Sequence, residues 1–266
     1  LAAISSSTDP DCHDGFGPYM PGFDIIPYDD LAALEKAVQD PNVCAFMVEP
    51  IQGEAGVFVP ADGYLKGVRE LCSKHKVLFI ADEIQTGLCR TGKMLCCDHE
   101  GVRPDLLILG KALSGGVLPV SAVLADDEVI LGIKPGEHGS TYGGNPLACA
   151  VAIESLQVLK DEKLDQNAAK MGEILRAGLR KMDYKWVAQV RGKGLLNAIV
   201  IDHDAGANAW DICVQMKNNG LLAKPTHDNI IRFAPPLVIN EEQMNESLAI
   251  ISKSFAQVEE SRMARS

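Results

Sequence analysis

The sequence has no long apolar stretch and too few basic side chains for several classes of protein. No run approaches the roughly 20 apolar residues that span a bilayer, so we expect no membrane partner. Lysine and arginine total 25 against 36 aspartate and glutamate residues, which gives a formal net charge of -11. Because a nucleic-acid binder needs a basic surface that follows phosphates, this balance argues against nucleic acid and favours small-molecule substrates.

The eight cysteines show no paired C-x-x-C spacing. Most of them lie within apolar runs, as small buried side chains do, which indicates a reducing compartment. The sequence that most resembles a metal site is Cys96, Cys97, Asp98 and His99, with Cys89 upstream. No second spaced pair completes a tetrahedral site, so we expect no bound metal.

Hydrophobic periodicity divides the chain into two parts. Between residues 29 and 126, helical patterns alternate with short apolar runs, which is typical of parallel strands joined by crossover helices. Strands are expected at 43–48, 77–81, 106–109 and 121–124, and helices at 29–39 and 63–76. From residue 147 to residue 182 the pattern is almost wholly helical, with a break near 161–163. Residues 29–126 are therefore predicted to form a doubly wound α/β layer.

The rest of the chain mixes strands and helices, as a smaller α+β domain does. Strands are expected at 195–201 and 230–233, and helices at 209–218 and 241–258. The fold class predicted from the whole pattern is α/β, with a mostly parallel sheet in the large domain. We expect residues 1–155 to belong to that large domain and residues 156–266 to form the small one.

Asp82 and Lys111 follow two of the expected parallel strands. The carboxyl ends of such strands meet at one edge of the sheet, where ligands bind, so the carboxylate and the amine should face one crevice. A single aspartate at this place more often caps a turn, and a single lysine is usually a solvated surface charge. A partly desolvated lysine, however, can attack a carbonyl, as in enzymes that hold an aldehyde cofactor.

The glycines around Lys111 do not form a nucleotide-binding motif. Gly110, Gly115 and Gly116 could cradle a phosphate, but the lysine precedes the glycine pair, unlike in a P-loop. The Gly192–Gly194 segment lacks the third glycine of a dinucleotide fingerprint. A nucleotide kinase is therefore not expected.

Four sequence blocks in order carry a more specific signal. They are VEPIQGEAG at 48–56, ADEIQTG at 81–87, GK at 110–111 and HGSTYGGN at 138–145. Together they resemble the class III aminotransferases, which are pyridoxal-phosphate-dependent enzymes of fold type I. The similarity runs from the start of the chain to near Ser254, and the loops at 191–198 and 232–236 most resemble the ornithine-acting branch of this family.

The resemblance implies a role for each residue of the cofactor site. Lys111 would bind the aldehyde of pyridoxal 5'-phosphate covalently and then carry a proton during catalysis. Asp82, also catalytic, would pair with the pyridine nitrogen, and Gln85 would contact the phenolic oxygen of the ring. Thr141, with Ser140, would hydrogen-bond the cofactor phosphate of the neighbouring subunit, so the active site would require a homodimer. Without the resemblance these hydroxyls would be ordinary turn residues.

The resemblance also implies that Glu54 and Arg232 select the substrate. Arg232 would bind the α-carboxylate of glutamate or 2-oxoglutarate, and Glu54 would neutralise it when an ω-amino substrate is present. The alternative for this pair is a structural salt bridge between domains. The expected reaction moves the δ-amino group of ornithine to 2-oxoglutarate. Acetylornithine or 4-aminobutyrate as donor, a non-catalytic dimerising remnant and a phosphate-binding regulatory module remain as alternatives.

The chain begins at Leu1, in a polar stretch, and not at a methionine. In the family, the phosphate loop and the aromatic residue that stacks on the ring lie upstream of the matching blocks. We therefore expect the N-terminal part of the large domain to be missing and residues 1–266 alone to be weakly active or inactive. The resemblance implies the mitochondrial matrix, with the cytoplasm as the alternative.

Overall fold

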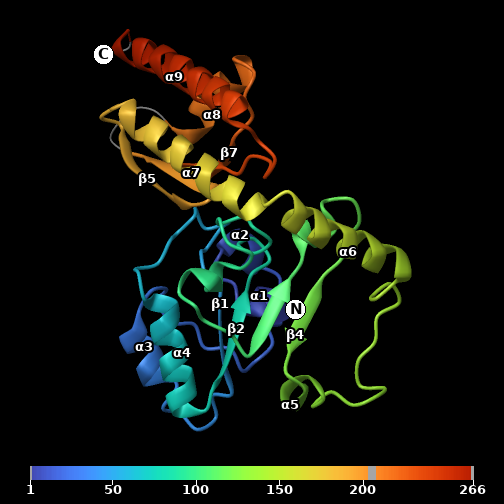
Figure 1. Ribbon diagram of the computed structural model, residues 1–266. Coiled ribbons are helices and arrows are strands. Elements are labelled where there is room, and N and C mark those ends of the chain that lie inside the picture. The colour runs from blue at the N-terminus through green and yellow to red at the C-terminus, as the bar shows by residue number, and fades with distance from the viewer. Residues whose placement is uncertain (1, 203–207, 265–266) are drawn as a thin grey trace.

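The computed structural model describes residues 2–202 and 208–264, so Leu1, which the sequence interpretation took as a truncated start, lies outside the described residues. Two separate four-stranded sheets organise the chain (Figure 1). Helices α6 (Pro146–Asp161) and α7 (Leu164–Lys181) form the connection between the part of the chain with the first sheet and the part with the second sheet. Of the described helices, none is both long enough and apolar enough to cross a membrane.

The first sheet has the order β1-β2-β3-β4. Its strands are β1 (Ala45–Val48), β2 (Leu78–Asp82), β3 (Leu106–Leu109) and β4 (Ala122–Ala125). The first three are parallel, as predicted. β4 runs antiparallel to β3, so the prediction of parallel strands is wrong for β4. The connection between them contains only the one-turn helix η2 (Lys111–Ser114) and not the crossover helix that usually leads into a parallel strand.

Helix α4 (Tyr64–His75) packs against β2 and, with α3 (Leu31–Ala37), forms the core on that side of the sheet. Its apolar side chains recur at helical spacing, so that Leu65, Val68 and Cys72 share one buried face. Phe79 and Ala81 of β2 are fully buried beneath them. Burial of a large apolar side chain of this kind contributes about 1.5–3 kcal/mol, which fixes the strand that leads to Asp82.

The second sheet is wholly antiparallel, with the order β5-β6-β8-β7. Its strands are β5 (Val187–Lys193), β6 (Leu196–Ile201), β7 (Lys224–Thr226) and β8 (Ile230–Phe233). β6 and β8 were predicted, whereas β5 and β7 were not. β5 carries polar side chains with a bulge, and β7 is three residues long and contains Pro225.

Side chains alternate between the two faces of this sheet. On one face, Ile199 and Ile231 join a core with α7, α8 (Ala209–Asn218) and α9 (Glu241–Met263). On the other face, Ala198 and Ile230 pack against Val57, which belongs to the loop after β1. The second sheet is therefore fixed against the first part of the chain on the face that also carries Arg232.

The predicted break in the long helical region is confirmed, since α6 ends at Asp161 and α7 begins at Leu164. Lys163 between them has a positive φ of 51°, which no continuous helix of L-residues adopts. The domain boundary at residue 155 stays a prediction. The remaining short helices are α1 (Ala2–Ser5), α2 (Pro10–His13), η1 (Cys96–His99) and α5 (Asp127–Ile130).

Candidate active site

Asp82 and Lys111 lie at the same edge of the first sheet. Asp82 is the last residue of β2, and it is in register with Ile108 of the parallel strand β3. Lys111 begins η2, two residues after β3 ends at Leu109. In Figure 1 the arrowhead of β2 points toward the second sheet. The sequence prediction that both side chains come from adjacent carboxyl strand ends is therefore confirmed.

Lys111 has two properties that suit a nucleophile. Its backbone φ is 50°, which is uncommon for a residue other than glycine and marks a strained position. Desolvation lowers the pKa of its amine, and the positive charge of Arg232 acts in the same direction. Within residues 2–202 and 208–264, the structure gives the amine no hydrogen bond or ion pair. Its neutral form is therefore more populated than that of an ordinary surface lysine.

The turn after β2 is fixed from inside by a buried carboxylate. Glu83 is fully buried, and its carboxylate accepts hydrogen bonds from Thr86 Oγ1 at 2.5 Å, the Cys96 amide at 2.9 Å and the Cys97 amide at 2.8 Å. The turn that begins at Cys96 thus supplies backbone donors to Glu83. Asp82 directly precedes Glu83 and Gln85 follows it by two residues, so Glu83 holds the backbone from which both side chains extend.

Gln85 touches the loop that follows β1. A Cβ atom placed on Gly53 would lie 2.5 Å from Gln85 Oε1, so a larger residue here would displace the end of the Gln85 side chain. The Gly53 amide donates to Glu49 Oε2 at 3.2 Å, which holds the start of the loop. Burial raises the pKa of Glu49, and the nearby carboxylates of Asp82 and Glu54 contribute to the shift. The loop and the turn therefore form one wall of the site.

Glu54 leaves this loop and meets two cations of the second sheet. Its Oε2 lies 2.8 Å from Arg232 Nη1, and its Oε1 accepts a hydrogen bond from Lys224 Nζ. These bonds lower the pKa of Glu54, with Lys224 the largest contributor. Arg232 Nη1 also donates to the Gly53 carbonyl at 3.0 Å. The predicted pairing of Glu54 with Arg232 is thus present, and Lys224 is an addition that the sequence did not indicate.

Arg232 is almost enclosed, with 10% of its side chain exposed. Its Nε atom is buried and has no hydrogen-bond partner in the described part of the chain. A buried donor without a partner costs about 1–3 kcal/mol, so an incoming acceptor at this atom would be favoured. The guanidinium is therefore suited to bind a carboxylate.

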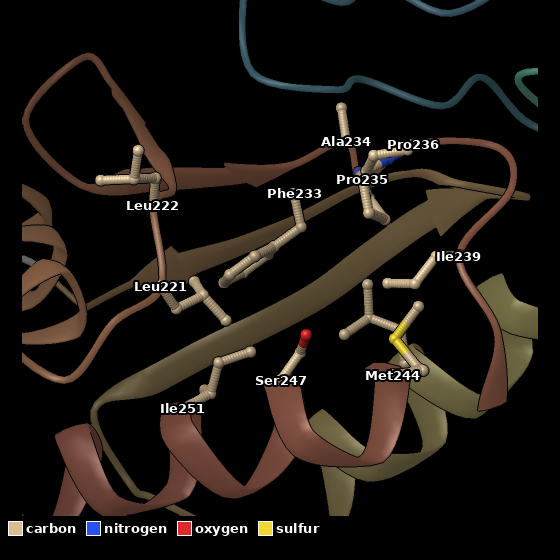
Figure 2. A pocket seen from close by; sticks show the side chains of 11 residues that line it. Leu221, Leu222, Phe233, Ala234, Pro235, Pro236, Ile239, Met244, Ser247 and Ile251 are labelled. Atoms are coloured by element: carbon tan, nitrogen blue, oxygen red, sulfur yellow. The ribbon is translucent and has the colours of Figure 1, made fainter. Parts of the chain in front are cut away.

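An apolar pocket of about 300 Å³ lies elsewhere, between α9 and the loop after β8 (Figure 2). Phe233 of β8 lines this pocket. Its neighbour Arg232 points to the opposite face of the sheet, because successive side chains of a strand alternate, and so lies outside the pocket. Of the described residues that line it, only Ser247 has a polar side chain. This pocket has no acid or amine for proton transfer, so the candidate site is the cluster around Lys111.

Comparison with known proteins decides the family. The model of the class-III aminotransferase family matches residues 1–255. The chain belongs to the class III aminotransferases. It is 66% identical to the mitochondrial ornithine aminotransferase of Rattus norvegicus over 255 residues, which are 96% of this chain and 58% of the relative. The mitochondrial ornithine aminotransferase of Drosophila melanogaster is also 66% identical, over 96% of this chain and 59% of the relative.

Solved structures agree with the fold. An ornithine aminotransferase structure from Toxoplasma gondii, with pyridoxal phosphate in partial occupancy at its active site, has a TM-score of 0.96 and 55% identity. The match covers 99% of this chain and 63% of that structure. The chain therefore has the α/β architecture of this family and spans about three-fifths of the length of its relatives.

Class III aminotransferases depend on pyridoxal phosphate, and the residues of this chain fit the cofactor's reactive end. Lys111 has an amine of lowered pKa, as attack on an aldehyde requires. Asp82 supplies a half-buried carboxylate at the strand end, where it accepts a hydrogen bond from the Ile84 amide at 3.0 Å. Gln85 supplies an amide that contacts Gly53. This donor set suits an aromatic aldehyde with a ring nitrogen.

Ser140 and Thr141 are not brought to this cluster. Both are exposed in the segment between α5 and α6, which extends to one side of the first sheet (Figure 1). Ser140 Oγ accepts a hydrogen bond from the Gly143 amide at 2.9 Å. Among the described contacts, none joins either hydroxyl to Lys111 or Asp82. Their assignment to a neighbouring subunit stays a prediction.

Arg191 of β5 donates to the Gly56 carbonyl at 2.8 Å and so also holds the loop after β1. Sequence reasoning missed four residues of the site region: Glu49, Glu83, Arg191 and Lys224. The first three lie inside blocks that carried the family resemblance, but the sequence alone gave them no separate role. Lys224 had no signal of its own, because its strand was not predicted. Only the pairing of β7 with β8 places it beside Arg232.

Proposed function

We propose that the full gene product transfers the δ-amino group of ornithine to 2-oxoglutarate, giving glutamate semialdehyde and glutamate. The full gene product here means the protein translated from the complete coding sequence that contains these residues. The observation that carries the proposal is the Glu54–Arg232 ion pair, whose two charges both act on the Lys111 amine. It is supported by 66% identity to a relative named ornithine aminotransferase.

The cofactor, when bound, supplies a protonated aromatic ring that accepts electrons as the substrate C–H bond breaks. Asp82 would keep the proton on the ring nitrogen through a charge-assisted hydrogen bond. Gln85 would orient the ring through its phenolic oxygen. Lys111 would hold the aldehyde carbon and, once released by the substrate amine, move the proton at the substrate carbon.

Arg232 and Glu54 would let one site accept two differently charged substrates. The ornithine δ-amino end is cationic before it reacts, so Arg232 must then be neutralised by Glu54. The α-carboxylate of 2-oxoglutarate instead needs the guanidinium, whose planar fork of N–H groups donates two hydrogen bonds to a carboxylate. Because the substrates use the site one after the other, ping-pong kinetics are expected.

The proposal includes a homodimer and a mitochondrial location. The exposed loop with Ser140 and Thr141 would complete the phosphate site of a second subunit. The relatives from Rattus norvegicus and Drosophila melanogaster are named mitochondrial, which supports the same compartment for this protein.

The test uses the full gene product with added pyridoxal phosphate. Borohydride reduction followed by peptide mapping should place the cofactor on Lys111. Lys111→Ala should remove this label and lower ornithine-dependent turnover by at least about 10²-fold, the contribution of a positioned acid–base group. Lys74→Ala is the control, because Lys74 forms an exposed pair with Glu35 at 2.7 Å.

Two outcomes would overturn the proposal. One is a label on a different lysine, or turnover that survives the Lys111 substitution. The other is a donor panel in which acetylornithine or 4-aminobutyrate reacts faster than ornithine.

A further inference from the structure

Glu54 is shared by two cations that are neighbours across a pair of strands. Lys224 of β7 and Arg232 of β8 are directly opposite in the antiparallel register, so their side chains leave the same face of the sheet. Glu54 places one carboxylate oxygen on each of them. Like charges at opposite positions repel, and Glu54 neutralises this repulsion.

The two cations differ in freedom. Arg232 has 10% of its side chain exposed, whereas Lys224 has 54% exposed. Lys224 is therefore able to follow a moving carboxylate, and Arg232 is not. Lysine also has a flexible stem and a compact charge that does not require a fixed geometry.

The backbone of the loop is anchored separately from the Glu54 side chain. Arg191 of β5 donates to the Gly56 carbonyl from Nε at 3.1 Å and from Nη2 at 2.8 Å. Val57, next to Gly56, is fully buried. A change of partner at Glu54 is therefore expected as a side-chain rotation, with the loop held in place.

We propose that Lys224 is a specificity-determining residue, which holds the Glu54 carboxylate while Arg232 is released to bind the α-carboxylate of 2-oxoglutarate. Within residues 2–202 and 208–264, Lys224 and Arg232 are the cations paired with Glu54, so without Lys224 the state in which Glu54 has left Arg232 would be less populated. In the ornithine half reaction Glu54 stays on Arg232, so Lys224 contributes little. This inference rests on the proposed function and adds the residue that lets the pair open.

The two half reactions allow a direct test in the full gene product. Single-turnover rates are measured with ornithine on the pyridoxal form and with 2-oxoglutarate on the pyridoxamine form. Lys224→Gln should lower kcat/KM for 2-oxoglutarate about 2- to 5-fold, mainly through KM, as expected for one exposed ion pair. The ornithine value should change by less than about 2-fold. The ratio of the two changes separates the proposed role from a general loss of activity.

Two variants serve as controls. Lys224→Arg keeps the charge and should restore most of the 2-oxoglutarate reaction. Lys74→Gln removes the exposed Lys74–Glu35 pair and should change neither half reaction. The midpoint of urea unfolding is measured for each variant, so that loss of folded protein is separated from loss of specificity.

The outcomes separate the two proposals. If the unmodified protein does not react with ornithine, the proposed function fails. If it does react, and Lys224→Gln affects both half reactions equally or neither of them, Lys224 is only a structural ion pair and the inference is wrong. Failure of Lys224→Arg to restore 2-oxoglutarate use would also contradict it.

Discussion

Gly53 and Gln85 are in such close contact that a methyl group added at Gly53 would displace the end of the Gln85 side chain. A Cβ atom on Gly53 would lie 2.5 Å from Gln85 Oε1 and 2.8 Å from Gln85 Cδ. The contact joins the loop that carries Glu54 to the turn that carries Asp82. The loop after β1 and the turn after β2 are therefore in contact at one glycine.

Gly53→Ala should weaken cofactor binding by displacing the Gln85 side chain. The clashing atoms are the flexible end of Gln85, which can rotate away, so we expect the lower end of the overpacking cost, about 1 kcal/mol or about a 5-fold loss of affinity. The dissociation constant of pyridoxal phosphate, measured by absorbance titration of the full gene product, tests this. In a Gln85→Ala background the same glycine substitution should cost nothing further, because the clashing atoms are gone. Equal losses in both backgrounds would show that the contact with Gln85 is not the cause.

Glu83→Ala should destabilise the protein through its buried hydrogen-bond network. The substitution leaves Thr86 and the amides of Cys96 and Cys97 without their acceptor, and each unsatisfied buried group costs about 1–3 kcal/mol. We expect a loss of at least about 3 kcal/mol in the free energy of unfolding, measured by urea denaturation. Glu35→Ala, at an exposed pair, should cost no more than about 1 kcal/mol. Similar costs for the two variants would contradict the role given to Glu83.

The sequence predicted the elements whose burial is strong and whose pattern is regular. β2 and β3 are short and mostly apolar, and they place Asp82 and Lys111 at predictable strand ends. The direction of β4 was not predictable in the same way, because an apolar run is equally suited to either orientation. The resemblance of four ordered blocks, and not periodicity, gave Glu54, Gln85 and Arg232 their expected roles.

What the sequence could not give is contact between distant residues with weak local signals. Lys224 lies in a three-residue strand with Pro225, and such a strand exists only because β8 pairs with it. Glu83 is charged and would be expected at the surface, but the amides of a turn more than ten positions away satisfy it inside the protein. Both depend on tertiary packing, which no local pattern encodes.

Gly172→Ala should disturb the packing of α7 on the second sheet. A Cβ at this position would lie 1.8 Å from the carbonyl oxygen of Gly194, a backbone atom that cannot rotate away. We expect a loss of about 3 kcal/mol or more in the free energy of unfolding, although alanine favours the helix by about 1 kcal/mol. Gly178→Ala in the same helix meets only the flexible end of Leu248, at 2.5 Å from Cδ1, so it should be much less harmful. Thermal and urea unfolding compare the two, and equal effects would mean that the Gly194 contact is not rigid.

The reactivity of Lys111 should depend on pH through the pKa of its amine. Two charged neighbours, Arg232 and Glu54, shift this pKa in opposite directions. Arg232 lowers the pKa of the Lys111 amine, as do Arg90 and Lys224, whereas Glu54 raises it. Removing the positive charge of Arg232 makes the protonated amine easier to form, so Arg232→Gln should raise the pKa. Removing the negative charge of Glu54 does the reverse, so Glu54→Gln should lower it.

The pH dependence of pyridoxal phosphate capture by the full gene product, followed by absorbance, measures these shifts. Only the neutral amine attacks the aldehyde, so the capture rate rises as pH increases through the pKa of Lys111. The rising limb should move to higher pH in Arg232→Gln and to lower pH in Glu54→Gln, and it should not move in Glu35→Gln, whose charge is not among those acting on Lys111. Shifts of the same sign in the first two variants would mean that structural change, and not charge, controls the amine, because an electrostatic cause requires opposite signs for opposite charges.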